Sequence, residues 1–246
     1  MRVTAIIQAR MGSTRLPGKV LMDLGGETVL SRVVSRVRRA SLVHEVVVAT
    51  TESASDDAVV AESGRLNASL FRGSERDVLD RYFAAAKHFR SDAVVRITSD
   101  CPLIDPSLID DLINKFLEER ADFACNVWPR TYPRGLDAEV FTTAALSRVW
   151  QMADQPHQRE HVTPLFYERK DADLFCFVSV RGEADFSRHR WTLDTREDLQ
   201  LIRSIYAALN NRSDFSWREA LELVESSPEL YAQNSQVVQK PMLETA

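Results

Sequence analysis

The chain has 246 residues, of which 44% are hydrophobic and 27% are charged, and its net charge is −5. A chain of this length and composition can bury one sizeable core, so a single large α/β domain is favoured over two small domains. The slightly acidic balance gives no sign of a nucleic-acid binder, so any phosphate site must be local.

Short apolar runs alternate with helical patterns in the first part of the chain. The apolar runs predict strands at residues 3–9, 45–51, 69–73 and 93–99. Apolar residues at helical spacing predict helices at residues 28–40, 55–66 and 75–90. Ser74 and Asp77 resemble a capping box for the third of these helices, and Asp105 before Pro106 predicts the start of a fourth. This alternation favours a mainly parallel, doubly wound α/β sheet.

The regular alternation ends near residue 122. The remaining strands are expected at residues 123–128, 175–180 and 189–195. Between them a helix is expected near residues 143–153, and prolines cluster. We interpret residues 123–188 as a subdomain on the same sheet that serves the substrate and dimerisation.

Two further helices are predicted near the C-terminus. Thr195 with Asp198 forms one capping pattern, and Ser216 with Glu219 forms another. Residues 1–227 are therefore predicted to be one domain. Residues 228–246 are predicted to be a polar tail that frays.

Cysteine usage and the absence of a long apolar run indicate the compartment. The three cysteines lie far apart and match neither a disulfide framework nor a paired-cysteine metal site, which is typical of a reducing compartment. No apolar run reaches the length of a membrane span, and the N-terminus lacks a secretory signal pattern. We expect a soluble, cytoplasmic protein whose partners are neither membranes nor nucleic acids.

The loop after the first predicted strand, within AIIQARMGSTRLPGKVL (residues 5–21), combines cations with glycines and a proline. Ligands of open α/β sheets bind beyond the carboxyl ends of the strands, which is where this loop lies. The spacing of its glycines does not match a P-loop, and no dinucleotide-binding glycine pattern occurs. Arg10, Arg15 and Lys19 are still suited to phosphate oxygens. The alternative is a solvated basic turn.

This loop closely resembles a motif of the CMP-sugar synthetases, the cytidylyltransferases that activate ulosonic and neuraminic acids. The resemblance is closest to the branch typified by a spore-coat polysaccharide biosynthesis protein (SpsF-like). It implies a Rossmann-like, three-layer nucleotidyltransferase sheet of the GT-A type, and CTP bound over the loop. It also implies catalytic roles for Lys19, Arg10 and Arg15. The nucleotide-binding residues that it implies are Ala9, Arg10, Gly12, Ser13, Arg15, Lys19, Gly73 and Arg76.

Two aspartates follow predicted strands on the side of this loop. Asp100 comes at the end of AVVRITSD, and Asp194 at the end of HRWTLD. Mg²⁺ prefers a few carboxylates and completes its shell with phosphate oxygens and water. The family resemblance identifies the same two residues as Mg²⁺ ligands, in SDCPLID and LDTREDL. Without metal the two charges should repel, so Asp100→Asn should slightly stabilise the fold. Each aspartate alone is also common in turns and at helix starts.

Two other segments resemble the base and acceptor regions of the family. In RGSERDVLDRY (72–82), Arg76 could donate to cytosine, or could equally form a surface ion pair at a helix start. In TYPRGLDAEVF (131–141), Arg134 could bind an acceptor carboxylate, and Asp137 and Glu139 could bind sugar hydroxyls or an amino group. Arg134 could also be a solvated hairpin residue. Cys101 is rejected as a nucleophile because no base lies near it in the sequence, and His157 and His161, at i and i+4, lack a further zinc ligand. No general base is identified.

The resulting expectation is a Mg²⁺-dependent cytidylyltransferase that transfers CMP from CTP to a sugar acid and releases pyrophosphate. The alternatives are a nucleotidyltransferase for a sugar phosphate, a GT-A type glycosyltransferase, and a non-catalytic nucleotide-binding relative. A homodimer is expected, because the aromatic residues of the subdomain suggest an apolar patch; the alternative is that they fill the core of the subdomain. These residues are Trp128, Tyr132, Phe141, Trp150, Phe166 and Phe175.

Overall fold

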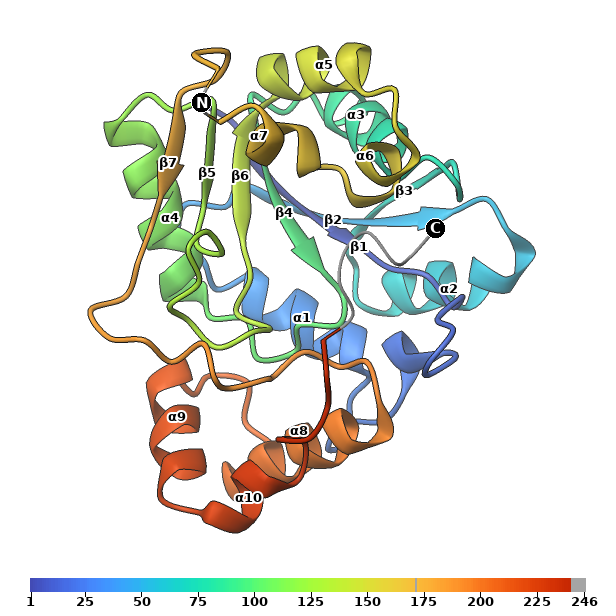
Figure 1. Ribbon diagram of the computed structural model, residues 1–246. Coiled ribbons are helices and arrows are strands. Elements are labelled where there is room, and N and C mark those ends of the chain that lie inside the picture. The colour runs from blue at the N-terminus through green and yellow to red at the C-terminus, as the bar shows by residue number, and fades with distance from the viewer. Residues whose placement is uncertain (171, 240–246) are drawn as a thin grey trace.

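The computed structural model describes residues 1–170 and 172–239 (Figure 1). The strands in this part of the chain are β1 (Val3–Gln8), β2 (Glu45–Thr51), β3 (Ser69–Gly73), β4 (Ala93–Thr98), β5 (Phe123–Cys125), β6 (Glu139–Thr142) and β7 (Phe177–Ser179). The α-helices are α1 (Val29–Val37), α2 (Asp57–Arg65), α3 (Val78–His88), α4 (Pro106–Glu118), α5 (Thr143–Met152), α6 (Pro156–His161), α7 (Pro164–Glu168), α8 (Arg196–Ala208), α9 (Trp217–Glu225) and α10 (Pro228–Ala232). The short 3-10 helices are η1 (Lys19–Leu21) and η2 (Ala54–Asp56).

The described strands form one sheet in the order β3-β2-β1-β4-β6-β5-β7. β1 pairs in parallel with both β2 and β4, and β2 pairs in parallel with β3. β6 runs antiparallel to its neighbours β4 and β5, and β7 is parallel to β5. The prediction of a mainly parallel α/β sheet is confirmed. The irregular region after residue 122 extends this sheet through β5, β6 and β7.

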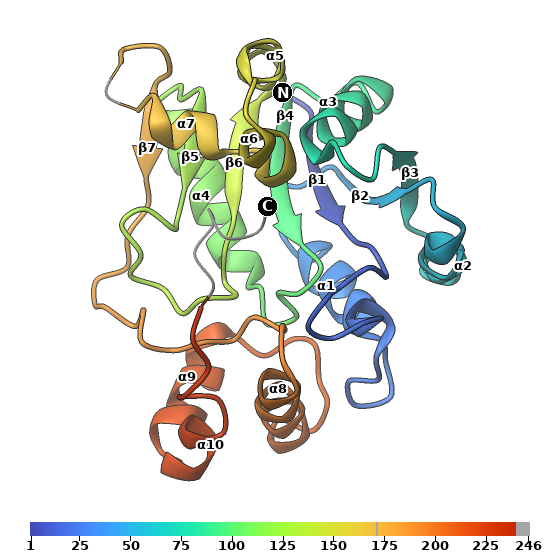
Figure 2. The same cartoon turned by 45° about the vertical axis from the view of Figure 1, so that its right-hand side comes forward.

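Helices cover both faces of the sheet, as Figures 1 and 2 show together. Successive side chains of a strand point to opposite faces. In β1, Ile7 therefore packs with apolar residues of α1, α2 and α4, whereas Ile6 packs with those of α3, α5 and α7. A third apolar cluster joins α8 and α9 to Trp191 and Leu193. The fold therefore has the expected three layers, with α8 and α9 packed below one end of the sheet.

Some predicted elements differ from those of the structure. The helix α3 begins at Val78 and its N-cap is Asp77, not Ser74, because the Asp77 carboxylate accepts from the backbone N–H of Asp80 at 2.8 Å. The Ser74 hydroxyl instead accepts from the backbone N–H of Asp77 at 3.0 Å. The predicted caps at Asp105, Thr195 and Ser216 are confirmed.

The predicted strand at residues 189–195 is wrong. Of these residues only Arg190 forms a β-bridge, with Arg134. The segment crosses the ends of other elements, and the backbone N–H of Leu193 donates to the carbonyl of Asp100 at 2.8 Å. This contact is what brings residue 194 close to residue 100. The strand predicted at 123–128 is also shorter and ends at Cys125.

The C-terminal part of the chain is more ordered than the sequence analysis expected. Residues 228–232 form α10, and Asn234 is buried. The predicted frayed tail is therefore wrong for residues 228–239, while the rest of it, 240–246, lies outside the described residues. None of the helices in the described ranges combines the length and the apolar character that crossing a bilayer requires.

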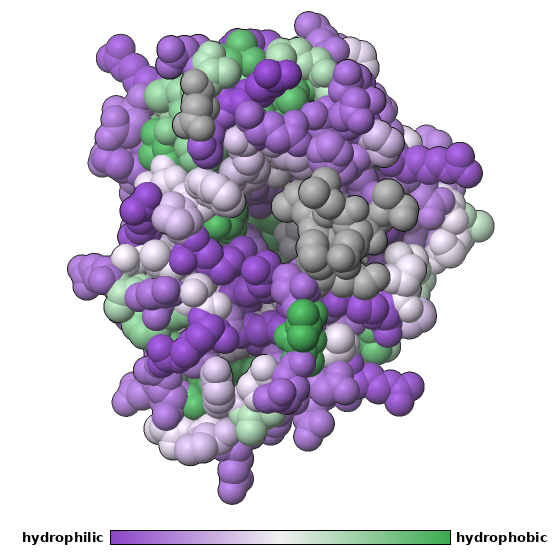
Figure 3. Space-filling view, in the orientation of Figure 1, coloured by the Kyte–Doolittle hydropathy of each residue, from purple (hydrophilic) through white to green (hydrophobic). Residues whose placement is uncertain are grey.

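The aromatic residues of the subdomain serve mainly as core. Phe141, Phe166 and Phe175 are buried and pack in the cluster under α5 and α7. Of the six aromatic residues named above, only Trp128 is strongly exposed, at 52%. The face in Figure 3 is mainly hydrophilic. The apolar patch on which the homodimer expectation rested is therefore not formed, and the homodimer stays a prediction without this support.

Candidate active site

The loop that follows β1 is held by a buried carboxylate. The backbone N–H of Met11 donates to Oδ1 of Asp56 at 2.7 Å, and Asp56 also accepts from the hydroxyl of Thr51. Within the loop, the hydroxyl of Ser13 accepts from the backbone N–H of Leu16 at 3.3 Å. Gly18 has a φ of 71°, a left-handed conformation that favours glycine, and it directs the chain into η1. Lys19 is thereby turned inward.

Lys19 joins the two aspartates that the sequence analysis identified. Its Nζ lies 2.8 Å from Oδ2 of Asp100, 2.9 Å from Oδ1 of Asp194 and 2.7 Å from the carbonyl oxygen of Leu193. The residue is only 9% exposed. Three predicted site residues from distant parts of the chain therefore meet at one point beyond the carboxyl ends of β1 and β4.

The charges in this triad stabilise one another. Burial alone would lower the pKa of Lys19, but the attraction of Asp100 and Asp194 raises it above its ordinary value of 10.5. Burial alone would raise the pKa of Asp100, but the Lys19 ammonium holds it below its ordinary value of 3.8. Lys19 and Asp100 are therefore both charged near neutral pH.

Asp194 is also held by two arginines. Among the described residues, Nη2 of Arg15 and Nη2 of Arg190 each lie 2.9 Å from its Oδ2. Arg15 was predicted from the loop motif. Arg190 was missed, although it is an arginine next to Trp191 and four positions before Asp194. Its role depends on the path of residues 189–195, which the sequence analysis read as a strand.

A cavity of about 290 Å³ lies over the loop. The predicted residues that line it are Ala9, Arg10, Gly12, Ser13, Arg15, Lys19, Asp100 and Asp194. The side chain of Arg10 is exposed and has no hydrogen bond or ion pair within the described residues, so it is available for an anion. The loop residues are thus gathered around one space, whose charged lining consists of Arg10, Arg15, Lys19 and Arg81 together with Asp100, Asp194 and Glu160.

The predicted base-binding residues lie elsewhere. Neither Gly73 nor Arg76 is among the described residues that line this cavity, and Arg76 is exposed. Arg81, one turn further into α3, lines the cavity instead and is only 2% exposed. A Cβ added to Gly73 would lie 3.2 Å from Cγ of Arg81, so Gly73 contributes by leaving room for that side chain. Arg81 and not Arg76 therefore lines this cavity, and the contact of Arg76 with the base stays a prediction.

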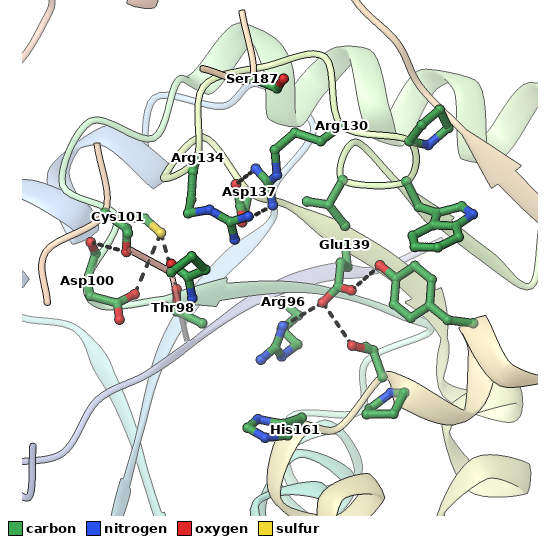
Figure 4. A pocket seen from close by; sticks show the side chains of 18 of the residues that line it. Arg96, Thr98, Asp100, Cys101, Arg130, Arg134, Asp137, Glu139, His161 and Ser187 are labelled. Carbon is green, nitrogen blue, oxygen red and sulfur yellow. Dashed lines mark hydrogen bonds and ion pairs between the residues drawn. The ribbon is translucent and has the colours of Figure 1, made fainter. Parts of the chain in front are cut away.

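A second cavity, of about 950 Å³, adjoins the first (Figure 4). The residues that line both cavities are Thr98, Asp100, His161 and Asp194. Arg134 projects into the second cavity and is half-buried, and its guanidinium has no hydrogen bond or ion pair within the described residues. Burial, followed by repulsion from Arg130, lowers the pKa of Arg134. A bound anion would relieve that cost.

The predicted acceptor carboxylates already have protein partners. Asp137 accepts from Nη1 and Nη2 of Arg130 at 2.5 and 2.8 Å. Glu139 is buried and accepts from Arg96 at 2.6 Å and from the hydroxyls of Tyr167 and Thr163 at 2.5 and 3.2 Å. Figure 4 shows both groups in the cavity wall. Glu139 therefore braces that wall, and Arg134 and Asp137 are the better placed of the three for a ligand.

The chemistry of Asp100 and Asp194 fits Mg²⁺. In the described ranges no group of three or more His, Cys, Asp or Glu side chains is arranged to hold a metal ion. A pair of carboxylates is nevertheless enough for Mg²⁺, because phosphate oxygens and water complete its coordination shell. The adjoining cationic loop is where such phosphates would lie.

Comparisons with known proteins agree with this geometry. A family model described as cytidylyltransferase matches residues 4–233. The spore coat polysaccharide biosynthesis protein SpsF of Bacillus subtilis is 34% identical over 233 residues, which cover 91% of this chain and 94% of that protein. A solved cytidylyltransferase of Leptospira borgpetersenii is 36% identical with a TM-score of 0.91, over 98% of this chain and all of that one.

A more distant structure shares the fold. It is a CMP:2-keto-3-deoxy-manno-octonic acid synthetase complexed with CTP, which is 21% identical with a TM-score of 0.65 and covers 85% of this chain and 100% of its own. The family match and the relatives of similar length leave the glycosyltransferase alternative without support. The chain belongs to the cytidylyltransferase family of nucleotidyltransferases.

Proposed function

We propose that this protein is a Mg²⁺-dependent enzyme that transfers CMP from CTP to an acidic sugar and releases pyrophosphate. The observation that carries the proposal is the position of Lys19, Asp100 and Asp194, which meet where two adjoining cavities share their lining. A transferase of this kind needs one site for each substrate and charge neutralisation between them. The cytoplasm stays the expected location.

The smaller cavity suits the triphosphate of CTP. Arg10, Arg15 and Lys19 provide cationic donors there, and guanidinium groups match phosphate oxygens with two donors at once. Asp100 and Asp194 would hold Mg²⁺, which supplies neutralisation of the phosphate charge when bound. CTP is also the nucleotide in the structure of the related synthetase.

The larger cavity suits the acceptor. The unpaired guanidinium of Arg134 offers a planar fork for a carboxylate, and Asp137 lies beside it for hydroxyl groups. The reaction joins an acceptor oxygen to the α-phosphorus of CTP while the bond from that phosphorus to the bridging oxygen breaks. The proton of the acceptor hydroxyl passes to solvent water, and the electron pair of the broken bond leaves with pyrophosphate, beside Lys19.

The test is pyrophosphate release measured with CTP, UTP, ATP and GTP against a panel of ulosonic acids, neuraminic acids and sugar phosphates. We expect release with CTP and a sugar acid, and formation of the CMP-sugar by mass spectrometry. Equal release with all four nucleotides would remove the preference for cytidine. No release with any pair would contradict the proposal.

A second candidate acceptor is a sugar phosphate. The observation in its favour is the concentration of arginines around the larger cavity, since Arg96, Arg130 and Arg134 all line it. The Arg96 and Arg130 side chains are neutralised by Glu139 and Asp137, which leaves one free guanidinium and favours a singly charged carboxylate. The same panel separates the two acceptor classes.

A further inference from the structure

The described C-terminal segment, residues 233–239, contacts the residues that hold Asp194. Asn234 on this segment is buried. In the sequence it lies far from the loops whose residues line the two cavities. We propose that Asn234 is a positioning residue for the Mg²⁺ site, acting through Arg190 and Asp198 on Asp194. This inference rests on the proposed function, because Asp194 matters in this way only if it binds the metal.

Arg190 is the link to Asp194. Its Nε and Nη2 lie 2.9 and 3.0 Å from the two carboxylate oxygens of Asp198, a pairing of two donors with two acceptors. The same Nη2 lies 2.9 Å from Oδ2 of Asp194. Asp198 is fully buried, so this guanidinium has little freedom to turn. The orientation of the Asp194 carboxylate is therefore set in part by Asp198.

Asp198 also fixes the backbone at residue 194. Its Oδ2 accepts from the backbone N–H groups of Asp194 and Thr195, both at 3.0 Å. Side chain and main chain of Asp194 thus depend on one buried carboxylate. Any change that shifts Asp198 moves the proposed metal ligand in two ways.

Asn234 completes this network from the C-terminal segment. Its Nδ2 donates to Oδ1 of Asp198 at 2.9 Å and to the carbonyl oxygen of Arg190 at 2.8 Å. Gln239, on the same segment, accepts from Nη1 of Arg190 and lines the larger cavity. Removing the Asn234 amide would leave a buried carboxylate and a buried carbonyl each short of a donor, which favours rearrangement.

Such outer partners tune metal sites. A carboxylate that ligates a metal is itself oriented by hydrogen bonds, and losing one of these partners typically weakens metal binding by about 10–100-fold. Asp194 has its partner in Arg190, and Arg190 has its own in Asp198 and Asn234. The C-terminal segment therefore belongs to the proposed active site rather than to a separate tail.

The experiment measures Mn²⁺ binding to the full-length protein in the presence of CTP, by the electron paramagnetic resonance signal of free Mn²⁺. We expect Asn234→Ala to weaken Mn²⁺ binding by about tenfold. The matched control is Gln233→Ala, which removes the neighbouring contact with the Ser204 hydroxyl, at 3.2 Å, and leaves the network intact. The Mg²⁺ concentration for half-maximal turnover should rise in parallel for Asn234→Ala only.

A second variant keeps the inference testable if Asn234→Ala does not fold. Gln239 is exposed, so Gln239→Ala should fold, and it should weaken Mn²⁺ binding in the same direction by about threefold. Unchanged Mn²⁺ affinity with a lowered melting temperature would show that Asn234 has a purely structural role. That result would overturn this inference and leave the proposed metal site standing. A wild-type protein that does not bind Mn²⁺ with CTP overturns the proposed metal site as well.

Discussion

Nζ of Lys19 lies 2.8 Å from Oδ2 of Asp100, although 81 positions separate the two residues. The ammonium group also contacts Asp194, so it attracts both carboxylates, which were expected to repel each other. Asp100→Asn is therefore expected to lower the stability of the fold, because it removes the attraction between Asp100 and Lys19. The sequence alone had predicted a small gain in stability from relief of the repulsion between Asp100 and Asp194. Lys19 therefore contributes to the charge balance of the site, in addition to the phosphate contact that we propose for it.

Asp100→Asn tests the proposed metal site. The change keeps the size of the side chain and removes its charge, so turnover should fall by about 100-fold or more. The melting temperature should fall slightly and not rise, since Lys19 loses one ion-pair partner while it keeps Asp194 and the carbonyl of Leu193. Paired melting and turnover measurements check this. Normal turnover in a destabilised variant would end the metal-site proposal.

Lys19→Met should change how stability depends on pH. In the wild type the pKa of Asp100 lies below 3.8, so its contribution to stability is present above that pH and is lost as the pH falls through the lowered pKa. Without Lys19, burial raises the pKa of Asp100, and the charged carboxylate then destabilises the fold near pH 7. Each unit of pKa change corresponds to about 1.4 kcal/mol.

The measurement for Lys19→Met is the melting temperature from pH 7 to pH 4. The difference between wild type and variant should be largest near pH 7 and should shrink as the pH falls. The Arg15→Met variant is the control, because Arg15 pairs with Asp194 and not with Asp100. A difference that stays constant across this range would show that Lys19 does not govern the ionisation of Asp100.

Arg134→Ala tests the acceptor site. The guanidinium lies in the larger cavity without a protein partner, so its removal should cost the acceptor about 2 kcal/mol, or roughly thirtyfold in KM. The KM for CTP should change little, because Arg134 does not line the smaller cavity. Steady-state kinetics with each substrate varied in turn would show this. A larger increase in the KM for CTP than in the KM for the acceptor would show that Arg134 serves the nucleotide site and not the acceptor site.

Arg76→Ala tests whether CTP is contacted by Arg76, which precedes α3, or by Arg81, which lies within α3. The structure places Arg76 on the surface and Arg81 in the cavity lining, so Arg76→Ala should change the KM for CTP by no more than about twofold. Isothermal titration with CTP provides an independent check. A tenfold loss of affinity would restore Arg76 as a contact of the base.

Local patterns were enough for most of the sheet and for the loop after β1. Continuous apolar runs predict strands such as β1 and β4 because a strand covered on both faces is apolar throughout. The loop residues Arg10, Arg15 and Lys19 follow one another within a few positions, so their shared location needs no knowledge of distant contacts. The caps at Thr195 and Ser216 are equally local.

Only the tertiary structure decided which distant groups meet. Arg190 and Asn234 support Asp194 because residues 189–195 cross the sheet ends through a hydrogen bond from Leu193 to Asp100, and not by joining the sheet as a strand. Similarly, Arg81 lines the cavity and Arg76 does not, and the N-cap of α3 is Asp77, three residues after the apparent cap Ser74. Helix starts and crossing segments are set by competition among contacts far apart in the chain, and local sequence carries little of that information.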